Sequence, residues 1–157
     1  MKSTEQLANR LHEVILSGTW IANTNFKDQL ENLDWRIATT SIEEHHNTIS
    51  VIAQHIHYYI EGLKNVFING KLEISDKHSF DFPPIKSHAE WMAIQKKLWE
   101  DTEALSKLIE KMPQSQLYDD FVDKKYGSYL RNINGMIEHC YYHLGQIVLI
   151  KKLVLKN

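Results

Sequence analysis

Two histidines near the C-terminus, His139 and His143, have the spacing of a metal-binding pair. They lie four residues apart in the apolar run IEHCYYHLGQI, residues 137–147. On a helix, residues four apart share one face with their Cβ atoms about 5–6 Å apart, so both imidazoles can reach one ion at about 2.0–2.1 Å. With nine histidines in the chain, about 0.5 pairs of this spacing are expected by chance. The pair is therefore compatible with a metal site and with two histidines that hydrogen-bond inside the core.

His143 falls within the apolar stripe of this segment, and a buried imidazole without a partner costs about 1–3 kcal/mol. A backbone carbonyl, a water molecule or a metal ion would satisfy it. Gln146 follows one turn later and would orient a ring or a water molecule beside the ion. Gly135, one turn before His139, leaves either an empty volume or room for close helix packing. The residues on this line of the helix are Asn132, Gly135, His139, Tyr142, His143, Gln146 and Ile150.

A third ligand must come from another helix, and the segment ISVIAQHIHYYIEGL offers two histidines. His55 and His57 flank Ile56, the centre of its apolar stripe, and each lies about 100° from that centre on opposite sides. Periodicity therefore does not choose between them. The remaining histidines considered for this role are expected to be exposed on the surface; they are His45, His46, His78 and His88.

Other metal and hydrolytic sites do not fit the sequence. It contains no HExxH motif and no CxxC pair, and Glu43–His46 is its single Glu-x-x-His, where a ferritin-like di-iron bundle needs two. A Ser-His-Asp hydrolase needs a nucleophile on a sharp turn, and no such turn is evident. Cys140 is the single cysteine and is interpreted as a structural residue.

Helical periodicity runs through most of the chain and predicts a four-helix bundle. A short additional helix is expected around Lys27–Leu33. Residues 71–86 contain Pro83 and Pro84 and show no helical period, so they form either a connector across the end of the bundle or a functional lid. The four long helices are predicted to run to Gly18 from the N-terminal segment, from Ser41 or Asn47 to Gly70, from Ser87 to Pro113, and from about Ser128 to Leu155.

Length and composition indicate a single domain spanning residues 1–157. The formal net charge of −2 with dispersed basic residues argues against nucleic-acid binding. No segment reaches the roughly 18 apolar residues of a membrane span, and the N-terminal segment has no apolar core of a signal peptide. A cytoplasmic protein without membrane attachment is expected.

Two histidine motifs resemble the signatures of the DinB-like (YfiT-like) metalloenzyme family. HCYYHLGQI is similar to the last-helix signature, and NTISVIAQHIHYYIEGL to the second-helix signature. FDFPPI, the helix with Trp91, and FVDKKYGSYLRNINGMIEH also resemble one subgroup of that family. The resemblance implies an up-down-down-up four-helix bundle with a metal in a pocket between helices. Carried over by position, His55, His139 and His143 are its ligands, whereas His57 lies two residues too late.

The resemblance further implies one divalent transition metal per chain, such as Zn, Ni or Fe, and a homodimer. Three neutral imidazoles leave a coordination position free to activate water or a thiol, so the implied reactions are hydrolysis or transfer of a low-molecular-weight thiol to a small-molecule substrate. Gln146 would support a ligand, and Tyr59, Asn132 and Tyr142 would be polar groups of the pocket. No carboxylate shares the ligand face, although Asp76 and Asp81 in the long loop could reach it. A metal-bound thiolate needs no such base, which favours thiol transfer over hydrolysis. The alternative is a non-catalytic metal-binding dimer used for binding or in a stress response.

Overall fold

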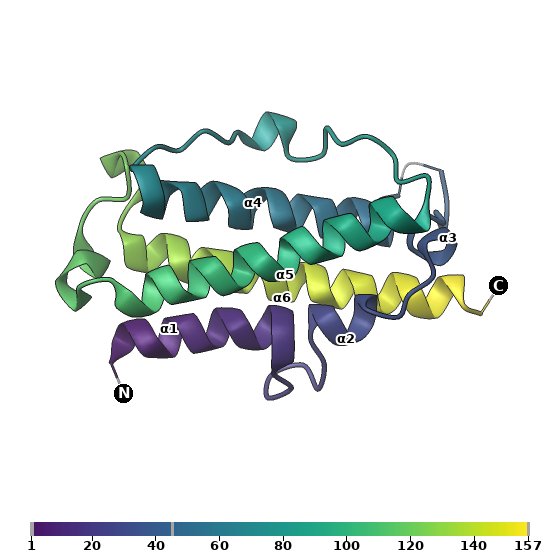
Figure 1. The fold of residues 1–157 in the computed structure, drawn as a ribbon, viewed down its shortest axis with the longest axis horizontal. Helices are drawn as coiled ribbons and strands as arrows, with labels where there is room; N and C mark the ends of the chain where they lie inside the picture. The colour runs from purple at the N-terminus through teal and green to yellow at the C-terminus, as the bar shows by residue number, and fades with distance from the viewer. Residues whose placement is uncertain (1, 45, 157) are drawn as a thin grey trace.

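The computed structural model describes residues 2–44 and 46–156, and every regular element within them is helical, as the sequence predicts (Figure 1). One isolated bridge pairs Asp120 with Ser128. The elements in chain order are α1 (Ser3–His12), the π-helical turn η1 (Glu13–Ser17), α2 (Phe26–Leu30), α3 (Trp35–Ala38), α4 (Ile49–Asn69), η2 (Asp76–His78), α5 (His88–Lys111), η3 (Gln114–Tyr118), η4 (Lys124–Tyr126) and α6 (Tyr129–Val154).

The long helices α1, α4, α5 and α6 lie side by side along the molecule (Figure 1). Helix α5 packs against both α1 and α4, and α6 contacts α4 and α1. In the view of Figure 1 the chain runs left to right in α1 and α6 and right to left in α4 and α5. The segment between α4 and α5 returns along the outer side of α4, so it is a connector that also lies over that helix.

The core between the helices is apolar and closely filled. Ile56 of α4, Leu98 of α5 and Ile137 of α6 have no exposed surface, and burying a side chain of this size contributes about 1.5–3 kcal/mol. Trp91 is also fully buried, and its indole N–H donates to the carbonyl of Leu33 at 2.9 Å. This bond fixes the irregular segment after α2 against α5.

Helix boundaries follow the sequence wherever a local cap determines them. Ser87 and Ser128 each accept a backbone N–H with the side-chain hydroxyl and start α5 and α6. Gly70 ends α4 in the left-handed conformation with φ 72°. These predicted ends are confirmed, because the signals lie within a few residues of the boundary.

The predicted start of α4 is wrong. Neither Ser41 nor Asn47 caps this helix; Thr48 does, with its hydroxyl accepting the N–H of Val51 at 3.3 Å. Ser41 instead donates its hydroxyl to the carbonyl of Glu43 in a turn. A Ser or Asn side chain that bonds to its own neighbourhood competes with helix initiation, which explains the error. The expectation for His45 lies outside the described residues.

The single short helix predicted around Lys27–Leu33 is confirmed as α2, and α3 follows it as a second short helix that was not predicted. Asn25 caps α2 by accepting the N–H of Asp28 at 2.9 Å, and Asp34 caps α3 by accepting that of Arg36 at 2.7 Å. The second cap starts a new helix.

Over the described ranges, no helix has both the length and the hydrophobicity that crossing a membrane requires.

Candidate metal centre

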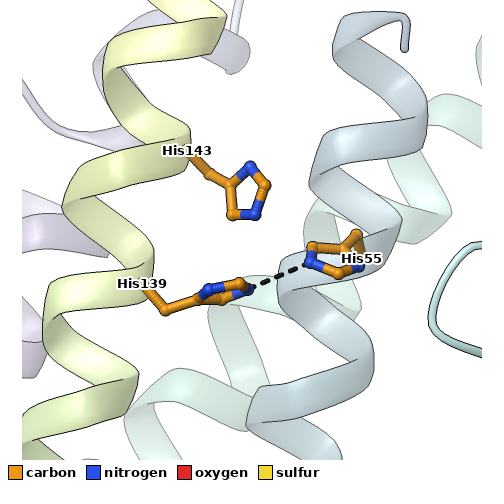
Figure 2. Close-up of side chains that lie close together, drawn as sticks. All are labelled: His55, His139 and His143. Carbon is orange, nitrogen blue, oxygen red and sulfur yellow. Dashed lines mark hydrogen bonds between the residues drawn. The ribbon is translucent and has the colours of Figure 1, made fainter. Parts of the chain in front are cut away.

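Three histidines from two helices meet between α4 and α6 (Figure 2). His55 comes from α4, while His139 and His143 come from successive turns of α6. One ring nitrogen of each lies within 4.8 Å of those of the other two, and the Nε2 atoms of His55 and His139 are 3.0 Å apart. His55 and His143 are 3% and 5% exposed. The structure therefore brings together the three residues that the sequence motifs single out.

The neighbours of α4 decide which of its two histidines joins this group. Ile56 faces the core, His55 turns toward α6 and His57 turns toward α5. The Nε2 atom of His57 lies 2.8 Å from Oδ2 of Asp101 on α5. Periodicity left this choice open because it does not say which helix packs on which side.

A second group of potential ligands, His57, Glu61 and Asp101, joins α4 to α5. Its chemistry is that of an ion-pair network, because the ammonium of Lys64 occupies the other oxygen of Asp101. Burial raises the pKa of Asp101, but the hydrogen bonds from Lys64 and His57 outweigh it, so the net pKa is lowered and the carboxylate is ionised. The Lys64 ammonium therefore already supplies the positive charge beside Asp101 that a metal ion would bring.

The outward-facing nitrogens of His55 and His143 are held by oxygen acceptors. Nδ1 of His55 lies 2.8 Å from the carbonyl oxygen of Ser79, and Nδ1 of His143 lies 2.6 Å from Oε1 of Gln146. Oxygen atoms of this kind only accept, so both Nδ1 atoms carry the proton and both Nε2 atoms are left with a free lone pair. This is the outer-shell arrangement that orients histidines around metal ions.

The inner face of the cluster fits a metal ion. The lone pair on Nε2 of His55 faces Nε2 of His139 at 3.0 Å, so a proton or a cation must lie between them. Two nitrogens this far apart, each bonded at 2.0–2.1 Å to one ion, subtend an angle of roughly 95° there, close to common coordination angles. Without a metal ion, only one shared proton would bridge these two nitrogens. A divalent ion suited to imidazole ligands would bridge them as well.

Burial keeps the three imidazoles neutral. It lowers the pKa of His139 from 6.5 to about 4, with further lowering from the charges of His143 and His55. Burial also lowers the pKa of His55 and of His143, against smaller opposing effects of their hydrogen bonds to Ser79 and Gln146. Neutral imidazole is the form that binds metal, so the site is prepared for ligation at neutral pH.

The segment between α4 and α5 covers one side of the cluster. Phe80 stacks on His55 with the ring centroids 4.0 Å apart, and its neighbour Ser79 supplies the carbonyl acceptor. Tyr58 also anchors this segment, because its hydroxyl donates to the carbonyl of Ser75 and accepts the Ser75 N–H. These contacts were not predicted, since a segment without periodicity gives no indication of which helix it lies on.

A cavity of about 840 Å³ opens beside His139, between α4, α6 and the segment after α4. A Cβ atom added to Gly135 would have no neighbour within 4 Å, so the predicted empty volume is confirmed and close helix packing at this glycine is wrong. Tyr59 lies edge-on to His55 and His139, and its hydroxyl donates to Oδ1 of Asp76 at 2.6 Å. Burial and the Asp76 carboxylate raise the pKa of Tyr59, which keeps its proton.

The other predicted pocket residues differ in position. Asn132 lines the cavity, but its amide donates to the carbonyls of Tyr126 and Ser128. Tyr142 is 63% exposed, and its hydroxyl accepts a hydrogen bond from the Gln146 amide. Asp76 reaches the cavity, whereas the carboxylate of Asp81 bonds to His78 on the surface.

The remaining expectations for single residues are confirmed. His46, His78 and His88 are exposed, as expected for surface histidines. Cys140 has no exposed surface, and burial raises the pKa of its thiol, which suits a structural role.

No protein-family model matches this chain, and no curated protein and no solved structure matches it either. The functional argument therefore rests on the geometry of the three histidines and the cavity beside them.

Proposed function

We propose that this protein is a metal-dependent enzyme of the DinB-like type, with one divalent transition metal held by His55, His139 and His143. The observation that carries the proposal is the convergence of three ring nitrogens within 4.8 Å beside a cavity of about 840 Å³. A bound ion of this kind supplies Lewis-acid activation of a thiol or of water. A low-molecular-weight thiol and a small electrophile, or a small hydrolysable substrate, are the proposed ligands.

The residues around the cavity have roles that this chemistry needs. The carboxylate of Asp76, held by the Tyr59 hydroxyl, lines the cavity with His139 and would accept a proton from a thiol or a water molecule entering it. Phe80 covers His55 and keeps bulk water from that side. Apolar side chains of Leu63, Leu72 and Met136 line the cavity together with polar groups, which suits a small organic molecule.

The finer architectural expectations belong to the same proposal. We propose an up-down-down-up bundle of the DinB-like type, and the helix directions visible in Figure 1 support it. A homodimer is proposed on the resemblance of the histidine motifs alone, and a cytoplasmic location on the single cysteine of the sequence. Light scattering of the purified protein tests the dimer without reference to the metal.

Elemental analysis of protein purified without added metal tests the site. We expect about one divalent ion per chain in the wild type, loss of that ion in His139→Ala, and retention in His57→Ala. The second variant is a matched control, because it removes a buried histidine of α4 that faces away from the cluster. Retention of the ion by His139→Ala would refute the ligand assignment.

The catalytic part is tested separately, by thiol-transfer and ester-hydrolysis assays on metal-loaded and chelated protein. A metal-dependent rate that disappears in His139→Ala supports the enzyme. A stoichiometric ion without any metal-dependent reaction, and without exchangeable water on the ion, supports the non-catalytic metal-binding dimer instead.

A further inference from the structure

A second hydrogen-bonded chain of three reactive side chains lies on the opposite side of the bundle, between α1 and α5. The Oγ atom of Ser17 lies 3.1 Å from Nδ1 of His12, and Nε2 of His12 lies 3.1 Å from Oε1 of Glu103. None of the three residues contributes to the histidine cluster or to its cavity. They form a separate site with the composition of a nucleophile, a base and a carboxylate.

The π-helical turn η1 creates this arrangement. In an α-helix, residues five apart point about 140° away from each other, so Ser17 would not face His12. An i→i+5 turn brings the later residue back over the earlier one, and turns of this kind are frequent at functional sites. The turn closes with the N–H of Gly18 donating to the carbonyl of Glu13 at 2.9 Å. A Cβ atom at position 18 would lie 1.7 Å from Cγ of Glu13, so this turn requires glycine.

The hydrogen bonds assign the protons. A glutamate carboxylate only accepts, so Nε2 of His12 carries the proton and donates it to Glu103. When His12 is neutral, Nδ1 therefore has the free lone pair, and the hydroxyl of Ser17 donates to it. Serine is thereby paired with a neutral imidazole base whose far side is oriented by a carboxylate, the proton arrangement that activates serine nucleophiles.

All three residues line one cavity of about 530 Å³. Ser17 is exposed, so a substrate can reach its hydroxyl. Leu16 and Trp99 form an apolar wall of the same cavity. Lys27 and Lys107 also line this cavity, and their ammonium groups lie 3.8 Å from the carboxylates of Glu31 and Glu103.

The position at the end of a helix limits the substrates. The helix C-terminus carries partial negative charge, which disfavours an oxyanion on the substrate. Reactions in which the leaving group departs readily are therefore favoured over amide cleavage. The apolar wall favours a short acyl chain or an aromatic leaving group.

We propose that Ser17, His12 and Glu103 hydrolyse small aryl or similarly activated carboxylic esters without a metal. The Oγ atom of Ser17 forms a bond to the carbonyl carbon as its proton passes to Nδ1 of His12. Collapse of the adduct breaks the ester C–O bond, and the leaving oxygen takes the proton from Nδ1. A water molecule then attacks the acyl-serine and gives its proton to His12, and release of the carboxylic acid restores the Ser17 hydroxyl.

The test measures labelling of serine by a fluorophosphonate and hydrolysis of p-nitrophenyl butyrate, both on chelated His139→Ala protein, which removes any contribution of the other site. Peptide mass spectrometry should find the phosphonate adduct on Ser17. Ser17→Ala should abolish the adduct, and His12→Gln should slow labelling by about 100-fold or more, the range for loss of a general base. Ser41→Ala, at an exposed serine elsewhere, is the control for non-specific labelling.

Glu103 is a positioning residue and has a matched control in the same cavity. Glu103→Gln should slow labelling, because the carboxylate that orients the His12 ring is gone, and Glu103→Asp should restore part of the lost rate. Glu100→Gln removes the same charge from the cavity wall without touching His12, and should leave the labelling rate unchanged. Lys107, whose ammonium lies 3.8 Å from the other carboxylate oxygen of Glu103, stays unchanged in all three variants.

Three results would overturn the proposal. These are the absence of an adduct on Ser17, equal labelling of wild type and His12→Gln, and equal labelling rates in Glu103→Gln and Glu100→Gln. Circular dichroism of each variant at the assay temperature ensures that a lost signal is not lost folding. Because chelated protein is used throughout, failure here leaves the proposed metal-dependent function unaffected.

Discussion

The side chain of Gln146 joins the candidate metal centre to the outer surface of α6. Its Oε1 atom lies 2.6 Å from Nδ1 of His143, and its amide nitrogen donates to the Tyr142 hydroxyl at 3.2 Å. The bond to Tyr142 fixes which end of the amide faces the histidine. Gln146 therefore determines the proton position on His143 and the direction of its free lone pair.

Replacing Gln146 by Leu should weaken metal binding by about 10–100-fold, the usual effect of removing an outer-shell partner of a metal ligand. Competition with a chelator of known affinity measures the change. Tyr142→Phe removes only the distant hydroxyl and should leave the affinity within about a factor of three of wild type. Equal affinity of Gln146→Leu and wild type would show that His143 is oriented by packing alone.

The depressed pKa of His139 predicts a pH-dependent stability of the metal-free protein. The pKa is about 4 in the folded state and 6.5 ordinarily. Between these values the unfolded chain binds more protons than the folded chain, so stability falls as the pH drops from about 6.5 toward 4. Urea unfolding midpoints across this range should depend less steeply on pH in His139→Gln than in wild type. His88→Gln, at an exposed histidine, should keep the wild-type slope.

The metal-free protein should stay folded, because apolar burial and not the ion holds the helices together. Chelation should leave the helical circular dichroism signal unchanged at 25 °C. Leu98→Ala, at a fully buried position, should lower the free energy of unfolding by about 2–5 kcal/mol. Leu149→Ala, at a position 58% exposed, should change it by less than about 0.5 kcal/mol. Global unfolding on chelation would contradict this and make the ion structural.

The charge network between α4 and α5 should contribute to stability and not to metal binding. Asp101→Asn leaves His57 and Lys64 without their shared carboxylate. Breaking a buried pair costs about 3–5 kcal/mol, and we expect the lower end because the Asp101 side chain is 18% exposed. Glu100→Gln, in an exposed pair with Lys96, should cost less than about 1 kcal/mol. Thermal melts compare the two, and the metal content of Asp101→Asn should equal that of wild type.

The sequence predicts best what local chemistry determines. The starts of α5 and α6 and the end of α4 at Gly70 follow from single capping residues. The pairing of His139 with His143 needs nothing beyond helical geometry. Where two residues compete to cap, as Ser41 and Thr48 do, the outcome depends on turn contacts that no period reveals.

The parts of the site that were not predicted depend on contacts between distant segments. Helical periodicity places His55 and His57 symmetrically about the core, and only the packing of α5 and α6 separates them. The carbonyl of Ser79 and the ring of Phe80 reach His55 from a segment without periodicity. The pairing of His12 with Ser17 requires a π-helical turn, which departs from the α-helical angle used to group residues on faces.

Cys140 follows His139 on α6, and its thiol has no exposed surface. An alkylating reagent can reach it only when the bundle opens, so its rate of alkylation records how often that happens. The chain thus contains one natural reporter of opening, adjacent in sequence to a candidate ligand but outside the cavity beside it. The rate of opening can therefore be measured by alkylating Cys140, without modifying any residue of the cavity beside His139.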